Sequence, residues 1–204
     1  MNENDLSVSV IVSYGAFREE IGGDLSGENT SNYQDIETGV VPSVGPLDVY
    51  RVHHHCSAYS TNETWLKETA PTVAVISTGD GNVYRHPAES CLERLHDSNL
   101  SKVYWTETGA GGAPRVNDVV GGDISIEVSP NATSYTVFYN GGSSTDTYPI
   151  KGASDAALPG RCSPAVKTTG QIATWLQYRE LARKRRLRLG SAHALPLYRT
   201  TATA

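Results

Sequence analysis

The stretch DVYRVHHHCSAYSTNETWLKETAPTVAVISTGDGNVYRHPAESCLERL, residues 48–95, decides the fold. Residues 47–52, LDVYRV, predict a strand that runs directly into three histidines. Residues 72–78, TVAVIST, are apolar and β-branched, as expected of a buried strand. A short helix ending at Thr69 is expected between these strands, and an amphipathic helix is expected from Pro87 to about residue 95. The residues able to cap the first helix are Ser60, Thr61 and Asn62.

The flanking sequence extends this pattern in both directions. Residues 6–14 and 16–21 predict two strands, and residues 26–46 have the Gly, Ser, Asn, Thr and Pro content of a loop. Towards the C-terminus, residues 102–107 predict another strand, and ISIEVSP and SYTVFYN predict a hairpin across residues 130–132. Strands and helices in this order are typical of a layered α/β fold.

The charge distribution divides the chain into two regions. Residues 1–150 carry 7 Lys and Arg against 20 Asp and Glu, whereas residues 151–204 carry 10 against 2. We therefore expect an α/β domain over 1–150 and a low-complexity linker with a basic, partly helical tail over 151–204, its helix spanning residues 170–189. The acidic domain is a poor electrostatic match for nucleic acid. The basic tail is either a patch that binds nucleic acid or another acidic surface, or a solvated helix.

Composition and cysteine usage exclude several classes of protein. With 38% hydrophobic and 19% charged residues, the chain is neither fibrous nor wholly disordered. No apolar run approaches the roughly 18 residues of a membrane span, and no signal-peptide pattern is visible, so we expect a soluble chain of undetermined compartment. Cys56, Cys91 and Cys162 are odd in number and lack a CxxC pair, which indicates neither a disulfide framework nor a cysteine zinc site.

Polar side chains follow three of the predicted strands. His53, His54 and His55 follow one strand, Asp24 follows the Gly–Gly turn after another, and His86 lies after a third. The carboxyl ends of strands are where open α/β folds build their sites. Imidazole and carboxylate groups together suit zinc or manganese. The alternatives are a solvated histidine loop and an aspartate that stabilises its own turn.

A run of motifs between about residues 6 and 128 resembles the C-terminal half of metallo-β-lactamase-fold hydrolases, and most closely their ComEC/Rec2-like group. The matching pieces, in order, are YGAFREEIGGDL, DVYRVHHHCS, Ser60, VAVIST, NVYRHP and CLERL. The resemblance implies the C-terminal half of an αββα metallo-β-lactamase sandwich. It also implies metal-assisted hydrolysis, with phosphodiesters as substrates, either nucleic acid or small phosphoesters.

The resemblance assigns a role to each polar residue. Asp24 matches the aspartate that bridges two metal ions, and His55 matches a metal-binding histidine. His54 matches a catalytic histidine near the substrate phosphate or the metal. Ser57 and Ser60 match substrate-facing or supporting positions, with Ser57 taken as catalytic. The role of His86 is less defined, and His53 is expected to be exposed.

The sequence departs from the family pattern at two points. Cys56 replaces the usual glycine of the H-H-G-S motif, where it is either a tolerated substitution or an adventitious ligand. The first metal motif of the family, H-x-H-x-D-H, is absent. The chain is therefore interpreted as a fragment or truncated form that binds metal weakly and is inactive by itself.

Three hypotheses follow for the function. The first is a two-metal hydrolase, present in part, that uses zinc or manganese. The second is a non-catalytic remnant of that fold that acts as a binding or interaction module. The third, a component of a DNA-uptake channel, is weakened by the absence of a membrane segment. A half-sandwich would leave a sheet face and an edge uncovered, which predicts self-association.

Overall fold

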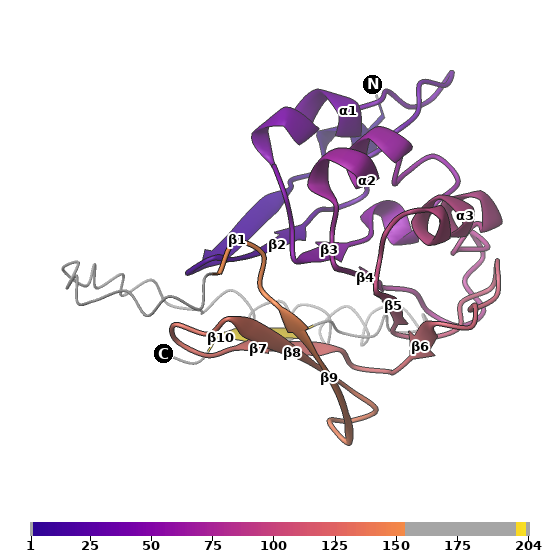
Figure 1. Cartoon of the computed structure of the whole chain (residues 1–204). Helices are drawn as coiled ribbons and strands as arrows, with labels where there is room; N and C mark the ends of the chain where they lie inside the picture. The colour runs from indigo at the N-terminus through magenta and orange to yellow at the C-terminus, as the bar shows by residue number, and fades with distance from the viewer. Residues whose placement is uncertain (1, 154–198, 203–204) are drawn as a thin grey trace, which may run out of the picture. The chain divides into compact units, whose positions relative to one another are not determined.

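The computed structural model describes residues 2–153 and 199–202 (Figure 1). The main helices are α1 (Glu37–Val40), α2 (Glu63–Thr69) and α3 (Glu89–Asp97). Short 3-10 turns are η1 (Asn4–Leu6), η2 (Val41–Ser43) and η3 (His53–His55). The strands are β1 (Val10–Tyr14), β2 (Phe17–Ile21), β3 (Val49–Arg51), β4 (Val73–Ile76), β5 (Lys102–Trp105), β6 (Asp118–Val120), β7 (Ser125–Val128), β8 (Ser134–Tyr139), β9 (Ser144–Pro149) and β10 (Arg199–Ala202).

The larger sheet has six strands in the order of the sequence, β1 to β6. Strands β1 and β2 form an antiparallel hairpin, and β2 to β6 are all parallel. Parallel strands need crossover connections, and α2 and α3 lie in two of them. The carboxyl ends of β2, β3 and β4 therefore meet at one edge of the sheet, where the loops after them come together.

Both faces of the large sheet are covered. Alternate residues of β4 show this, because Ala74 and Ile76 pack with the helices whereas Val73 and Val75 pack with the second sheet. Helices α1, α2 and α3 lie on one side of the sheet in Figure 1, and β7, β8 and β9 lie on the other. The expectation of an uncovered sheet face is thus wrong for the described residues, while self-association stays a prediction.

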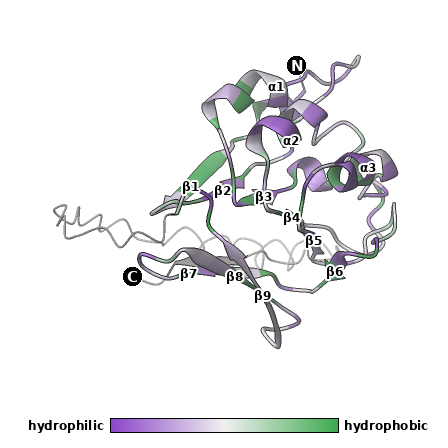
Figure 2. Cartoon of the chain, in the orientation of Figure 1, coloured by the Kyte–Doolittle hydropathy of each residue, from purple (hydrophilic) through white to green (hydrophobic). Residues whose placement is uncertain are grey.

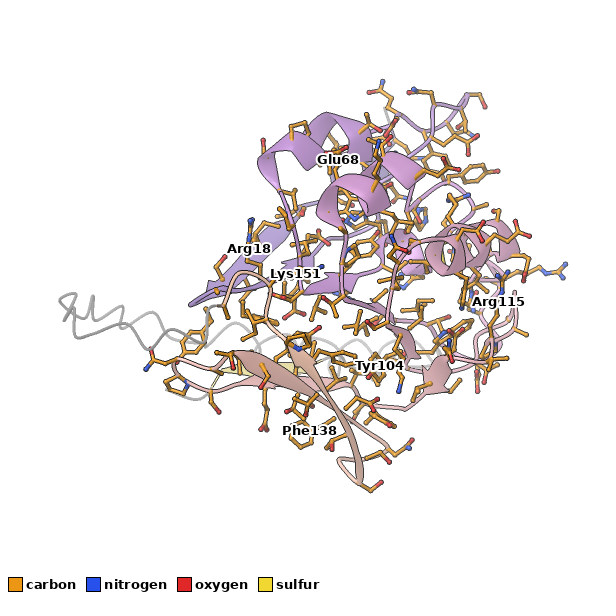
Figure 3. All side chains as sticks on the ribbon, viewed as in Figure 1. Arg18, Glu68, Tyr104, Arg115, Phe138 and Lys151 are labelled. Carbon is orange, nitrogen blue, oxygen red and sulfur yellow. A yellow bond between two sulfur atoms is a disulfide. The ribbon has the colours of Figure 1, made fainter. Side chains whose placement is uncertain are left out.

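The second sheet has the order β10–β7–β8–β9 and is joined to the first sheet by a buried aspartate. Asp48 accepts backbone hydrogen bonds from Arg18 and Lys151, both at 2.8 Å. These two residues lie on separate segments that approach each other in Figure 3. Burial raises the pKa of Asp48, although its hydrogen bonds and the charges of Lys151 and Arg18 oppose that rise. One carboxylate thus joins the hairpin β1–β2 to the segment that follows β9.

Most of the predicted elements are confirmed. Asn62 caps α2, since its side-chain oxygen accepts a hydrogen bond of 2.7 Å from the Trp65 amide. Helix α3 begins at Glu89, two residues later than expected, and carries hydrophobic and hydrophilic residues together in Figure 2. The predictions missed α1, β6, β9 and β10, the last of which lies in the segment expected to be a basic, partly helical tail. The predicted helix at 170–189 lies outside the described residues, and the domain boundary at 150 stays a prediction.

The structure also bears on the expectations about membrane spans and disulfide bonds. Among the described residues, no helix is both long and apolar enough to span a membrane. The prediction that the cysteines indicate no disulfide framework is wrong, because Cys56 and Cys91 form a disulfide bond across 35 residues of sequence. Turn η3 brings Cys56 against the first turn of α3, a proximity that cysteine spacing alone does not reveal.

Candidate metal site

The carboxyl ends of three neighbouring parallel strands bring Asp24, His54, His55 and His86 together. Asp24 follows β2, the histidine pair follows β3, and His86 lies in the loop between β4 and α3. The imidazole rings of His54 and His86 have centroids 5.5 Å apart, and those of His55 and His86 are 6.4 Å apart. These four residues, predicted from the sequence as metal-binding or neighbouring groups, thus converge at one edge of the sheet.

His55 is oriented by a hydrogen bond on the far side of its ring. Its Nδ1 lies 2.6 Å from the carbonyl oxygen of Ser77, so Nδ1 carries a proton and donates it. The other nitrogen, Nε2, faces the Asp24 Oδ1 atom at 3.6 Å. This pair is an ion pair when the imidazole is protonated. When it is neutral, two acceptors face each other, and a cation between them would satisfy both.

That separation fits two ligands of one ion. Two ligands about 2.1 Å from a tetrahedral zinc ion stand about 3.4 Å apart. The 3.6 Å between His55 Nε2 and Asp24 Oδ1 is close to this value. A nitrogen and a carboxylate oxygen also form a donor set that zinc or manganese accepts. The two residues fit a metal ion in both chemistry and spacing.

His54 and His86 provide neutral imidazole groups beside this pair. Burial lowers the pKa of His86 to about 4, and the neighbouring histidine charges lower it further while Asp24 opposes them. Burial also lowers the pKa of His54. The Nδ1 atoms of both rings are buried and lack a hydrogen-bond partner in the described part of the chain. Buried polar atoms without partners are rare and point to a missing ligand.

The donor set is nevertheless incomplete. Within residues 2–153 and 199–202, no group of three or more His, Cys, Asp or Glu side chains is placed so that it could hold a metal ion. Asp24 and His55 form a pair, and His54 and His86 stand beside it. Further ligands, or a closer approach of these two histidines, would be needed to complete a metal centre.

The two predicted serines lie beneath the histidine turn. Ser57 is buried, and its Oγ accepts a hydrogen bond from the Tyr59 amide at 3.3 Å. Ser60 is also buried, and its Oγ donates to the carbonyl oxygen of His53 at 2.9 Å. In this geometry both hydroxyl groups support the turn. The catalytic role of Ser57 stays a prediction.

His53 is fully buried, so the prediction that it is exposed is wrong. Its Nε2 lies 3.1 Å from Glu20 Oε1, and its Nδ1 lies 2.8 Å from Glu37 Oε1. Both carboxylates are fully buried too. Turn η3 directs this ring inwards and the next two histidines towards the site. We call this buried group of Glu20, His53 and Glu37 the buried triad.

Sequence reasoning missed the two glutamates of the buried triad. Glu20 lies in β2, and Glu37 lies in a segment that has the composition of a loop. Glu37 also accepts hydrogen bonds from the amides of Thr61 and Asn62, at 2.6 and 2.7 Å. The one feature of the sequence that indicates such a buried group is the third consecutive histidine, because a site at the end of a strand does not require three.

The buried triad makes stability depend on pH. Burial alone would lower the pKa of His53, but hydrogen bonds to Glu20 and Glu37, and then their charges, outweigh it and raise the pKa from 6.5 to about 9. Tyr50, the other titratable group against this ring, has its pKa raised well above its usual value by burial and stays neutral. The stabilisation is thus fully present below pH 6.5 and lost as the pH rises through about 9.

Urea unfolding over this range tests the pH dependence. The free energy of unfolding of the wild type should fall between about pH 7 and about pH 10 by more than that of the variant His53→Gln. The variant is the control, because it keeps all other groups that titrate at alkaline pH. Parallel curves for the two proteins would show that His53 is not charged in the folded state.

The chain is similar in sequence to two much longer proteins. The chain is 32% identical over 137 residues to Recombination protein 2 of Haemophilus influenzae, covering 67% of this chain and 16% of that protein. It is 28% identical over 108 residues to ComE operon protein 3 of Bacillus subtilis, covering 53% of this chain and 13% of that protein. The chain thus spans about one sixth or less of these relatives. No protein-family model matches it.

Proposed function

We propose, from this relatedness to ComEC/Rec2-like proteins, that the chain carries part of the metal centre of a phosphodiester hydrolase of metallo-β-lactamase type. One observation carries the proposal: Asp24 and His55 face each other at 3.6 Å where three parallel strands end. The succession of helices, large sheet and second sheet supports the metallo-β-lactamase assignment. It is compatible with the C-terminal part of a sandwich that has helices on its outer faces.

In this proposal, Asp24 and His55 are ligands of zinc or manganese. A bound ion supplies hydroxide at neutral pH, because it lowers the pKa of a coordinated water. The Ser77 carbonyl oxygen holds His55 with its Nε2 lone pair towards Asp24. His54 and His86 stay neutral near pH 7, since burial lowers the pKa of each. They then act as neutral hydrogen-bonding or metal-binding groups beside the pair.

The remaining ligands are proposed to come from outside the aligned segment. The relatives are about four times longer than this chain, since the aligned 137 residues make up 16% of one relative and the aligned 108 residues make up 13% of the other. A partial site explains both the pairing of Asp24 with His55 and the absence of a third ligand in place among the described residues. The substrate class, phosphodiesters of nucleic acid or of small molecules, is part of the same proposal.

Metal binding tests this function directly. The purified chain should retain zinc or manganese by elemental analysis and take up zinc in a calorimetric titration. Asp24→Asn and His55→Gln should each weaken zinc binding by at least about 100-fold, the upper range found for supporting residues of metal sites. Asp97→Asn, an exposed carboxylate on α3, is the matched control and should bind zinc as the wild type does.

The alternative function is that of a non-catalytic binding module, which keeps the fold but has lost the metal-dependent hydrolysis. The observation that favours it is the absence of a complete ligand group in the described residues. A wild-type chain without metal, whose zinc titration is unchanged by Asp24→Asn and His55→Gln, would overturn the metal-centre proposal and support this alternative. Hydrolysis of bis(p-nitrophenyl) phosphate is worth measuring only if the variants do lose zinc.

A further inference from the structure

The turn that carries the histidine pair has an unusual backbone. His54, His55 and Cys56 have successive φ angles of 49°, 54° and 61°, all in the left-handed region. Residues with a Cβ atom rarely adopt this region even singly, because the Cβ approaches the carbonyl oxygen that follows. Three in succession persist only when their surroundings hold them. This turn determines where the imidazole rings of His54 and His55 lie.

The Cys56–Cys91 disulfide joins this turn to helix α3. Both cysteines are fully buried, and their Cα atoms are 5.6 Å apart. Cys91 lies in the first turn of α3, next to Leu92, which is also fully buried. The amide of Ala88, at the N-cap of the same helix, donates to the Cys56 carbonyl oxygen at 2.7 Å. One end of the turn is thereby attached covalently to a helix held in the core.

Backbone hydrogen bonds also hold the turn. The Cys56 amide donates to the His53 carbonyl oxygen at 3.0 Å, and the Ser57 amide donates to the His54 carbonyl oxygen at 2.9 Å. The His54 amide donates to the Gly23 carbonyl oxygen at 3.2 Å, which connects the turn to the segment before Asp24. Without the disulfide, residue 56 would be a free cysteine in a conformation suited to glycine.

We propose that the disulfide is a redox-dependent positioning device: it keeps the His54–His55–Cys56 turn left-handed, and its reduction releases the histidine pair. In that reaction two thiols of a reductant supply two electrons and two protons. The bond between the two cysteine sulfurs breaks, two protein thiols form, and the reductant becomes a disulfide. Cys91 acts through Cys56 and is a positioning residue.

The consequence for the metal centre rests on the proposed function, whereas the consequence for the turn does not. If the turn relaxes, His55 loses its alignment with the Ser77 carbonyl oxygen and with Asp24. Structural disulfides persist in oxidising compartments and are rare in reducing ones. The device would therefore keep the site assembled in an oxidising environment and dismantle it in a reducing one.

Amide hydrogen exchange of the metal-free chain of 204 residues tests the effect on the turn. All proteins carry Cys162→Ser, so that only one cysteine pair remains. Reduction, or Cys91→Ala, should speed exchange of the Cys56 and Ser57 amides by about tenfold or more. The amides of β4 (Val73–Ile76) are the internal reference. They report how much of the change is a loss of global stability.

A second variant separates positioning from general core support. Cys56→Gly/Cys91→Ala also lacks the disulfide, but glycine adopts the left-handed conformation without a steric penalty. We expect the Ser57 amide to return towards the wild-type exchange rate in this variant, although the β4 amides stay as fast as in Cys91→Ala or become faster. Equal Ser57 exchange in the two variants, or a uniform change across the domain, would overturn the proposal.

Cobalt titration then distinguishes this inference from the proposed function. If both hold, cobalt affinity should fall by about tenfold or more on Cys91→Ala and recover in Cys56→Gly/Cys91→Ala. If the turn responds as predicted but the oxidised wild type binds no cobalt, the positioning device stands and the metal-centre proposal fails. If cobalt binds equally well to the oxidised and reduced chains, the device does not control the site, and this inference fails.

Discussion

Replacing His53 with alanine should lower the free energy of unfolding by about 3–5 kcal/mol, the range for breaking a buried ion pair by removing one partner. The ring lies between Glu20 and Glu37, and all three side chains are fully buried. The Oε2 atom of Glu20 already lacks a hydrogen-bond partner in the described part of the chain. Without the imidazolium, both carboxylates would remain buried in the core without the positive charge and the hydrogen bonds that now balance them. Urea unfolding near neutral pH measures the loss.

His55→Ala is the control for this prediction. That imidazole is about one-third exposed, and its partner Asp24 is more exposed still, so the loss should be about 1 kcal/mol or less. A second test is to repeat His53→Ala in a Glu37→Gln background. The cost of the substitution should be smaller there, because one of the two carboxylates is already neutral. Similar losses for His53→Ala and His55→Ala would refute the charged, structural role of His53.

Elements whose side chains follow a strict period could be predicted from the sequence. Strand β4 alternates between two apolar faces and is recognisable as a buried strand. Strands β6 and β9 could not be found in this way. The first has only three residues, and the second is rich in Ser and Thr on both faces. Pairing with a neighbouring strand, rather than their own composition, determines their conformation.

Helix α1 illustrates the same limit for helices. It spans only the four residues Glu37–Val40, and it includes Gly39, which disfavours helix. Its position is determined by tertiary contacts, since the Glu37 carboxylate binds His53 and two amides near the start of α2. No local pattern in residues 26–46 carries that information. Contacts between residues distant in the sequence therefore decide where this segment becomes helical.

The residues of the candidate site could be predicted from the sequence more fully than the buried residues that support them. Asp24, His54, His55 and His86 each follow a recognisable strand, and parallel strands bring their carboxyl ends together. The inward direction of His53 was not predictable, because a left-handed turn rather than an extended strand follows β3. Alternation along a strand would have placed His53 and His55 on the same side. The turn instead separates them, one into the core and one towards Asp24.

Gly22→Ala should lower the free energy of unfolding by about 1–3 kcal/mol, the usual cost of overpacking a core. A Cβ atom at residue 22 would overlap the His53 ring and would lie 2.6 Å from Glu20 Oε1, closer than real Cβ atoms approach. Neither group can move freely, because each holds the other within the buried triad. The added methyl group would therefore push the backbone of residue 22 outwards, and with it Asp24, two residues further on.

Gly22→Ala consequently connects the core to the candidate site. We expect it to weaken zinc binding as well as stability, because the Asp24 carboxylate would shift from its 3.6 Å approach to His55. Gly39→Ala is the matched control, since a Cβ atom there would meet nothing within 4 Å and the residue lies in a helix. It should leave stability unchanged or raise it by up to about 1 kcal/mol. If Gly22→Ala is as stable as Gly39→Ala, the buried triad tolerates movement, and its role in placing Asp24 must be abandoned.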